Sequence, residues 1–308
     1  MTNLKKDTIF KRYSMVALLL VVTVLLIFYA AEIKSSVLNG ARIAFFTVVP
    51  TLFPFMIISD FFTSLPMNNS GTFSNSFGRL FCKASSALNI FLLGSVCGFP
   101  LGVKCAVEKY KAGEIEKEEC EELIGFVNNP SLAFVISGVG LGMMGSARIG
   151  IFLYSIVLVS ALIVATIFCH KGQKNKEHAV FFEQKFDLTL SIKNSGLQCI
   201  SISTYIIFFS ALLGLINSVT KSSRLTALVS PLFEIGNAAT LLLRSEYFSD
   251  NFSFALLGFA LGFSGFSVHL QAFSLLPKEI SKRKYLIMKV AQGVICLILC
   301  AICYDIVK

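Results

Sequence analysis

Several polar side chains stand inside long apolar runs of this sequence, where they could bind a solute or an ion. Glu234 and Asn237 are three positions apart, so on a helix they share one face. His269 and Gln271 follow a glycine-rich stretch of another run, and Lys104 follows a break in an earlier one. Ionisable groups at membrane depth usually mark a substrate or ion path. The pattern therefore indicates binding and translocation rather than covalent chemistry.

Three interruptions of the apolar runs form a second candidate feature. Gly98 and Pro100 lie in the first, Asn128 and Asn129 precede a proline in the second, and Ser264 lies in the third. A broken helix is tolerated at membrane depth only where protein or a water-filled cavity satisfies the freed backbone groups. We therefore expect the breaks to line a substrate-binding site.

Each candidate also has a structural explanation that the residues alone leave open. Lys104 could attract an anion together with the free N–H groups of a half-helix, or it could extend to the membrane surface. Asn128 and Asn129 could cap two half-helices or face a solute. His269 could hydrogen-bond a neighbouring helix, and Glu234 could lie at the membrane interface.

The other reactive side chains indicate neither a catalytic nor a metal site. No C-x-x-C pair stands beside a histidine, and most of the nine cysteines lie in apolar runs, where they should pack as small hydrophobic side chains. The three histidines are scattered, and no nucleophile with a base and an orienting group can be proposed from spacing. We expect no enzymatic activity, no metal and no cofactor.

Composition identifies the elements that position these residues. Of 308 residues, 55% are hydrophobic and 15% are charged, and the mean hydropathy is +0.75, whereas soluble domains carry about a quarter charged residues. The net charge of +9 comes from short basic clusters between apolar runs, as in cytoplasmic membrane loops, so nucleic-acid binding is not expected. These features predict an all-α polytopic protein in a lipid bilayer.

About seven crossings plus re-entrant or broken helices should account for most of the chain. A first helix covers about 14–31, and Pro50 and Pro54 should kink or open the second span at about 42–62. Further apolar runs lie at 88–107, 123–145, 149–169, 196–217, 225–243, 252–276 and 285–303. The expected organisation is an N-terminal helix and loop at 1–40, a first transporter-like half at 41–170, a basic cytoplasmic linker at 171–195 and a second half at 196–308.

A faint internal similarity suggests that the two halves are repeats. Residues 81–102 resemble 232–266, with Gly94-x-x-x-Gly98 matching Gly258-x-x-x-Gly262. If 79–87, 123–145 and 225–243 re-enter the membrane, the basic clusters at 1–13, 170–193 and 278–284 all lie inside. The positive-inside rule then predicts a cytoplasmic N-terminus, an external acidic loop at 108–122 and an inverted second half.

Four motifs, in this order, resemble the sporulation integral membrane proteins of the YlbJ/SpoVV type, which carry the nucleoside recognition (Gate) domain. They are Val49–Phe55, Gly98–Lys104, Asn128–Ser131 followed by Gly138-Val139-Gly140, and Gly262–Gln271. The resemblance covers about residues 40–280. It implies a fold similar to that of concentrative nucleoside transporters and a role in moving dipicolinic acid into the developing spore.

The expected function is movement of a small anionic solute, above all dipicolinate, through a site between the broken spans. The expected location is a bacterial cell membrane, which the resemblance narrows to the forespore membrane. A nucleoside is the alternative solute. From a different class, the chain could be a structural membrane component of spore envelope assembly that transports nothing.

Overall fold

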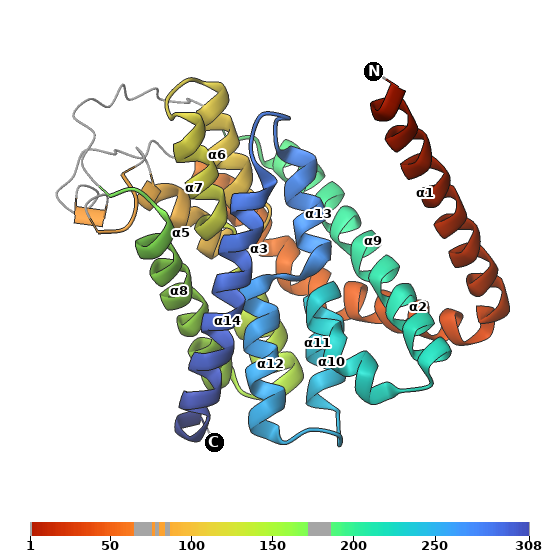
Figure 1. Ribbon diagram of the computed structural model, residues 1–308. Helices are drawn as coiled ribbons and strands as arrows, with labels where there is room; N and C mark the ends of the chain where they lie inside the picture. The colour runs from red at the N-terminus through yellow and green to blue at the C-terminus, as the bar shows by residue number, and fades with distance from the viewer. Residues whose placement is uncertain (1, 65–75, 78–79, 84–86, 172–185, 308) are drawn as a thin grey trace.

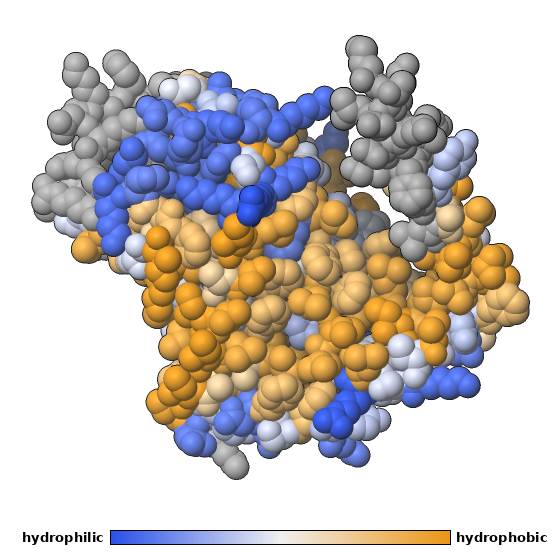
Figure 2. Space-filling view, in the orientation of Figure 1, coloured by the Kyte–Doolittle hydropathy of each residue, from blue (hydrophilic) through white to orange (hydrophobic). Residues whose placement is uncertain are grey.

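The structure is a computed structural model that describes residues 2–64, 76–77, 80–83, 87–171 and 186–307, and these segments contain helices and turns without any strand. Figure 2 shows a broad apolar band between two polar ends of the molecule. Within the described segments, five helices are long and apolar enough to cross a membrane: Ala30–Ile58, Ala147–Phe168, Leu188–Thr220, Asp250–Leu275 and Lys282–Ile306. The prediction of an all-α polytopic membrane protein is therefore confirmed.

The N-terminal part consists of α1 (Thr2–Phe28), α2 (Ala30–Ile43), the π-helical segment η1 (Ala44–Val48) and α3 (Val49–Ser64). Helix α1 starts at the end of the molecule that we call the N-terminal face, at the top of Figure 1, and stands beside the other helices. The π-helical turns directly precede Pro50, where the missing backbone N–H was expected to open the helix.

Helix α2 packs along the long helix α9 (Leu188–Thr220) through small residues. A Cβ atom on Gly40 would lie 2.2 Å from Ser210 Oγ, and one on Gly214 would lie 2.3 Å from Ser36 Oγ. Such close approach is the usual way in which membrane helices associate, because lipid provides no hydrophobic driving force between them.

The first repeat comprises a hairpin, a broken helix and a continuous helix. Helices α5 (Ala87–Cys97) and α6 (Leu101–Lys111) form the hairpin, α7 (Lys117–Val127) and the π-helical η2 (Phe134–Met143) form the broken helix, and α8 (Ala147–Phe168) returns. At one end Gly140 packs against Gly150, and at the other Cys169 Sγ hydrogen-bonds the Glu122 carbonyl at 3.9 Å. The α7–η2 pair therefore runs antiparallel to the whole of α8.

The second repeat has the same order of elements. Helices α10 (Ser223–Phe233) and α11 (Ile235–Leu243) form its hairpin, α12 (Asp250–Phe263) and α13 (Gly265–Leu275) its broken helix, and α14 (Lys282–Val307) its continuous helix. The rings of Phe254 and Tyr304 are in contact, and so are those of His269 and Tyr285, so α12–α13 runs antiparallel to α14. The two hairpins enter from opposite faces of the molecule (Figure 1), which makes the repeats inverted.

The sequence-based assignment of re-entrant segments is correct in one place and wrong in two. Residues 225–243 form the helical hairpin α10–α11, the shape expected of a re-entrant segment. However, 88–107 is a hairpin rather than a span, because Gly98, with φ of +81°, reverses the chain. Residues 123–145 do not turn back as a hairpin but continue through the broken helix α7–η2 along the length of α8, and 79–87 lies partly outside the described residues. The expected pairing of the motif at Gly94 with the motif at Gly258 is therefore wrong. Gly94 lies in the hairpin of the first repeat, whereas Gly258 lies in the broken helix of the second repeat.

The predicted placement of the acidic loop opposite the later basic clusters is also wrong. Glu121 Oε1 accepts a hydrogen bond from Ser281 N at 2.8 Å, and Glu122 Oε1 lies 3.1 Å from Lys284 Nζ. Glu122 thus pairs with a basic residue, and Glu121 with a backbone N–H, on the same face, the N-terminal face, so a count of basic residues alone misplaced the loop. In the expected linker at 171–195, α9 already begins at Leu188, and 172–185 lies outside the described residues.

Candidate functional site

The first hairpin has its tip against the break of the following helix. Gly94, Gly98 and Gly102 recur every four residues, and their Cβ positions would lie 2.2 to 2.6 Å from backbone atoms of Val127 and Ser131. Only glycine permits this approach between two backbones. The glycine spacing noted in the sequence therefore serves to dock the hairpin on the break at Asn128–Ser131.

The second hairpin makes the equivalent contact. Its tip is Glu234, and a Cβ on Gly265 would lie 2.9 Å from the carbonyl oxygen of Phe233. Ser264 and Gly265 form the break between α12 and α13, with φ of 78° and 70°. Each re-entrant tip therefore contacts the break of the next crossing helix, which is the relation expected of a structural repeat.

A cavity of about 40 Å³ lies where the two tips approach each other. Gly98 and Phe99 from the first tip, Glu234 from the second, and Ser131, Ser267 and Gln271 from the broken helices contribute to its wall. Val48, Leu52, Met56, Ile202 and Ile206 from η1, α3 and α9 supply an apolar side. One water needs about 10–15 Å³ of such space, so the cavity holds a few waters in this conformation.

Glu234 is buried, and its carboxylate caps α11. Oε1 accepts from Gly236 N at 2.8 Å, and Oε2 accepts from Asn237 N at 2.7 Å and from Asn237 Nδ2 at 3.0 Å. Asn237 Oδ1 in turn accepts from Ser210 Oγ at 2.9 Å, which ties the hairpin to α9. Glu234 thus lines the cavity, whereas Asn237 holds it in place.

The half-helices that begin beside the cavity differ in how their N-termini are capped. Ser131 Oγ accepts from Phe134 N at 3.1 Å at the start of η2, and Glu234 caps α11. Helices α6 and α13 begin after Pro100 and Ser264, and neither residue provides a side-chain cap. The N–H groups at these two starts retain the partial positive charge of a helix N-terminus.

Asn128 and Asn129 belong to a buried polar network beside the cavity. Lys289 Nζ donates to the Asn128 carbonyl at 2.9 Å and to Gln292 Oε1 at 2.7 Å, and Gln292 Nε2 donates to Asn129 Oδ1 at 2.8 Å. Asn128 Nδ2 donates to the hydroxyl of Tyr285 at 2.9 Å. The network joins the break of the first repeat to α14 of the second.

His269 lies at the edge of this network rather than in the cavity wall. Its Nδ1 is 3.1 Å from the Tyr285 hydroxyl, and its Nε2 has no hydrogen-bond partner within the described segments. Sequence reasoning missed Lys289 and Gln292. The available signal was a lysine inside the last apolar run with a glutamine three positions later, on one helical face.

The structure therefore brings Gly98, Glu234 and Gln271 into the cavity wall, with Pro100 and Ser264 at the adjoining tip and break. Lys104 lies apart from them. Its side chain is half exposed, and its Nζ is 4.0 Å from Glu108 Oε1 one turn along α6. The position fits the alternative in which Lys104 extends to the membrane surface.

Comparison with known proteins identifies one relative. The chain is 24% identical over 292 residues to the sporulation integral membrane protein YlbJ of Bacillus subtilis (strain 168), an alignment that covers 80% of this chain and 71% of the relative. No family model and no solved structure matches the chain. The similarity agrees with the resemblance recognised from the four motifs.

Proposed function

Because this chain is a YlbJ-type sporulation membrane protein, we propose that it is a transporter for a small organic anion of the dipicolinate class. In this proposal the solute binds between the two hairpin tips, the protein resides in the forespore membrane, and no covalent step takes place. The meeting of both tips and both helix breaks around one cavity is the observation that carries the proposal.

The repeat architecture supports transport because re-entrant hairpins serve little purpose in a protein that only spans the bilayer. Backbone that ends at membrane depth needs a polar cavity or protein partners. Paired interrupted helices in inverted halves are the arrangement in which secondary transporters bind their solutes near the midplane.

The uncapped starts of α6 and α13 support an anionic solute. Neither start has a side-chain cap. Leu101 N donates to the Gly98 carbonyl, and a carboxylate can accept from the N–H groups that follow, as it does at other helix N-termini. Two uncapped helix N-termini suit a solute with two carboxylates, because each N-terminus can bind one of them. The Glu234 carboxylate already accepts hydrogen bonds from the N–H groups at the start of α11, so it does not compete with the solute for the N–H groups of α6 and α13.

Movement of the tips is part of this mechanism. The cavity of about 40 Å³ accommodates a few waters but not an aromatic ring with two carboxylates. Separation of Gly98 from Ser131 in one repeat, or of Phe233 from Gly265 in the other, would widen the cavity toward one face at a time.

A nucleoside is the second candidate solute, and the cavity wall carries an observation in its favour. Among the described residues that line the cavity, none is a lysine or an arginine, while Glu234 and Gln271 offer acceptors for hydroxyl groups. A wall without a fixed cation among its described residues is the observation that favours a neutral solute.

Uptake by proteoliposomes containing the purified protein tests the proposal. Labelled dipicolinate should enter and nucleosides should not, and an inside-positive membrane potential should accelerate entry because the solute is an anion. Glu234→Gln removes a negative charge from the cavity while keeping one carbonyl acceptor for the cap, so dipicolinate affinity should hold or rise.

The opposite results would overturn the assignment. Nucleoside uptake that is insensitive to potential and falls in Glu234→Gln would establish the second candidate. Uptake of neither solute by protein that is folded in the liposomes would favour a structural role in envelope assembly.

A further inference from the structure

Three residues that are distant in sequence bring metal-ligating atoms together on the N-terminal face, away from the cavity. Cys82 precedes α5, Glu122 lies on α7, and Cys169 directly follows α8. Their two sulfur atoms and a carboxylate oxygen all lie within 4.8 Å of one another. All three side chains are buried: Cys82 is 0% exposed, Glu122 1% and Cys169 8%.

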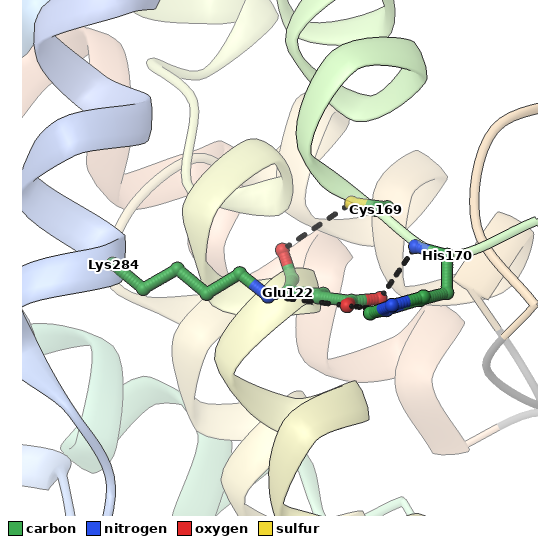
Figure 3. Close-up of polar contacts among 4 residues, drawn as sticks. All are labelled: Glu122, Cys169, His170 and Lys284. Carbon is green, nitrogen blue, oxygen red and sulfur yellow. Dashed lines mark hydrogen bonds and ion pairs between the residues drawn. The ribbon is translucent and has the colours of Figure 1, made fainter.

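The segments that carry these side chains are held together by backbone contacts. Lys83 N donates to the His170 carbonyl at 2.9 Å, which aligns Cys82 with Cys169. Cys169 Sγ donates to the Glu122 carbonyl at 3.9 Å, and His170 N donates to Glu122 Oε2 at 3.0 Å (Figure 3). These contacts hold the two thiols and the Glu122 carboxylate near one another without a bound ion.

We propose that Cys82, Cys169 and Glu122 form a binding site for a thiophilic divalent metal ion, with zinc as the best fit. Two sulfur ligands select zinc over the oxygen-preferring Mg²⁺ and Ca²⁺. Zinc binds cysteine sulfur at about 2.3 Å and carboxylate oxygen at about 2.0–2.2 Å in a tetrahedron. Ligand atoms would then be roughly 3.3–3.8 Å apart, so binding requires only a small contraction of the present cluster.

His170 and Lys284 complete the surroundings of this site (Figure 3). His170 Nδ1 contacts Glu122 Oε1, so the imidazole can orient the carboxylate toward the two sulfur atoms, and a water molecule could supply the fourth ligand. Its side chain is 73% exposed, which leaves the cluster a route to solvent. Lys284 Nζ lies 3.1 Å from the same carboxylate oxygen.

The charges balance when the ion binds. Zinc displaces one proton from each thiol, and both protons pass to solvent. Two thiolates and one carboxylate around Zn²⁺ leave one negative charge, which the Lys284 ammonium offsets. Bound metal would join the segment before α5 to α7 and the end of α8, next to the start of α14, and would stabilise this face of the protein.

Metal content of the purified full-length protein tests the proposal. Protein kept reduced in detergent, incubated with zinc and freed of excess ion should retain about one zinc per chain. Cys82→Ser and Cys169→Ser should lose it, and Glu122→Gln should bind roughly 10- to 100-fold more weakly, by analogy with loss of a supporting group. Cys120→Ser, two residues from Glu122 on α7, is the matched control and should retain the metal.

Two further measurements keep the result interpretable. Cobalt(II) added in place of zinc should give thiolate-to-metal charge-transfer absorption in wild type and in Cys120→Ser, in Glu122→Gln only at higher metal concentration, and not in Cys82→Ser or Cys169→Ser. Zinc should raise the unfolding temperature of the proteins that bind it in the same order. Size-exclusion profiles establish that the variants are folded. Absence of zinc from reduced wild-type protein, or equal loss of zinc in Cys120→Ser, would overturn the site, as would a Cys82–Cys169 disulfide that resists reduction.

Discussion

Gly98 provides the sharpest test of the contact between hairpin tip and helix break. In Gly98→Ala, the new Cβ would lie 2.6 Å from Ser131 N and 2.7 Å from Ser131 Cβ, at a residue whose φ is +81°. Gly113 is a matched control, because its φ is +73° and nothing lies within 4 Å of its Cβ position. Both substitutions strain the backbone, but only the first pushes against a neighbour.

The expected energies separate these two effects. A left-handed conformation costs a residue with a side chain about 1–2 kcal/mol. Overpacking against atoms that cannot move aside adds about 1–3 kcal/mol. Gly98→Ala should therefore lower the free energy of unfolding by about 2–5 kcal/mol, and Gly113→Ala by about 1–2 kcal/mol.

Denaturant titration in detergent and dipicolinate uptake by proteoliposomes measure the two consequences. Gly98→Ala should lose most uptake, because its tip can no longer close on Ser131. Gly113→Ala should transport normally, because its turn lies outside the cavity wall. Equal destabilisation by both substitutions, together with normal uptake by Gly98→Ala, would refute the docking of the tip on the break.

Three other predictions concern topology and charge. A cysteine introduced at Gly113 and one introduced at Ser281, each in a variant without the native cysteines, should react with an impermeant reagent from the same side of the membrane. Gly113 lies in the turn before α7, and Glu121 of α7 contacts Ser281. Labelling from opposite sides would contradict the path of α7–η2 along α8. Lys289→Met should lower uptake at least about tenfold but should lower the free energy of unfolding only slightly. The substitution removes two charge-assisted hydrogen bonds of about 1.5–3 kcal/mol each, and this loss is offset because a buried charge is removed as well. Unchanged uptake would show that the network does not position the break. Lys104→Met should leave uptake within about twofold of wild type, because its half-exposed side chain lies beside Glu108 on α6, outside the cavity wall. A large loss of uptake would return Lys104 to the site.

Local features of the sequence were sufficient to locate the interruptions. Gly98, Asn128 and Ser264 interrupt apolar runs, and the structure has a helix end at or beside each of them. Glu234 and Gln271 were recognisable as site candidates because few polar side chains occur in such runs. These inferences succeeded because helix breaking and the cost of burying polar groups are properties of the residue and its neighbours.

Contacts between distant segments decided what each interruption does. The chain reverses at Gly98 but continues through Asn128–Ser131, and the difference depends on docking against Ser131 and on the hydrogen bonds from Lys289 and Gln292. A charge count could not detect that Glu121 contacts Ser281 and that Glu122 pairs with Lys284 in the C-terminal part.

The sequence by itself determined that this protein is helical and lies in a membrane, because hydrophobicity summed over about 20 residues decides insertion. It also determined where the helices break and which side chains are costly to bury. Only the tertiary structure decided which breaks become hairpin tips, that Lys104 lies outside the cavity, and that Cys82, Glu122 and Cys169 come together. The physical reason is that these outcomes depend on packing between residues more than 30 positions apart, for which local pattern carries no signal.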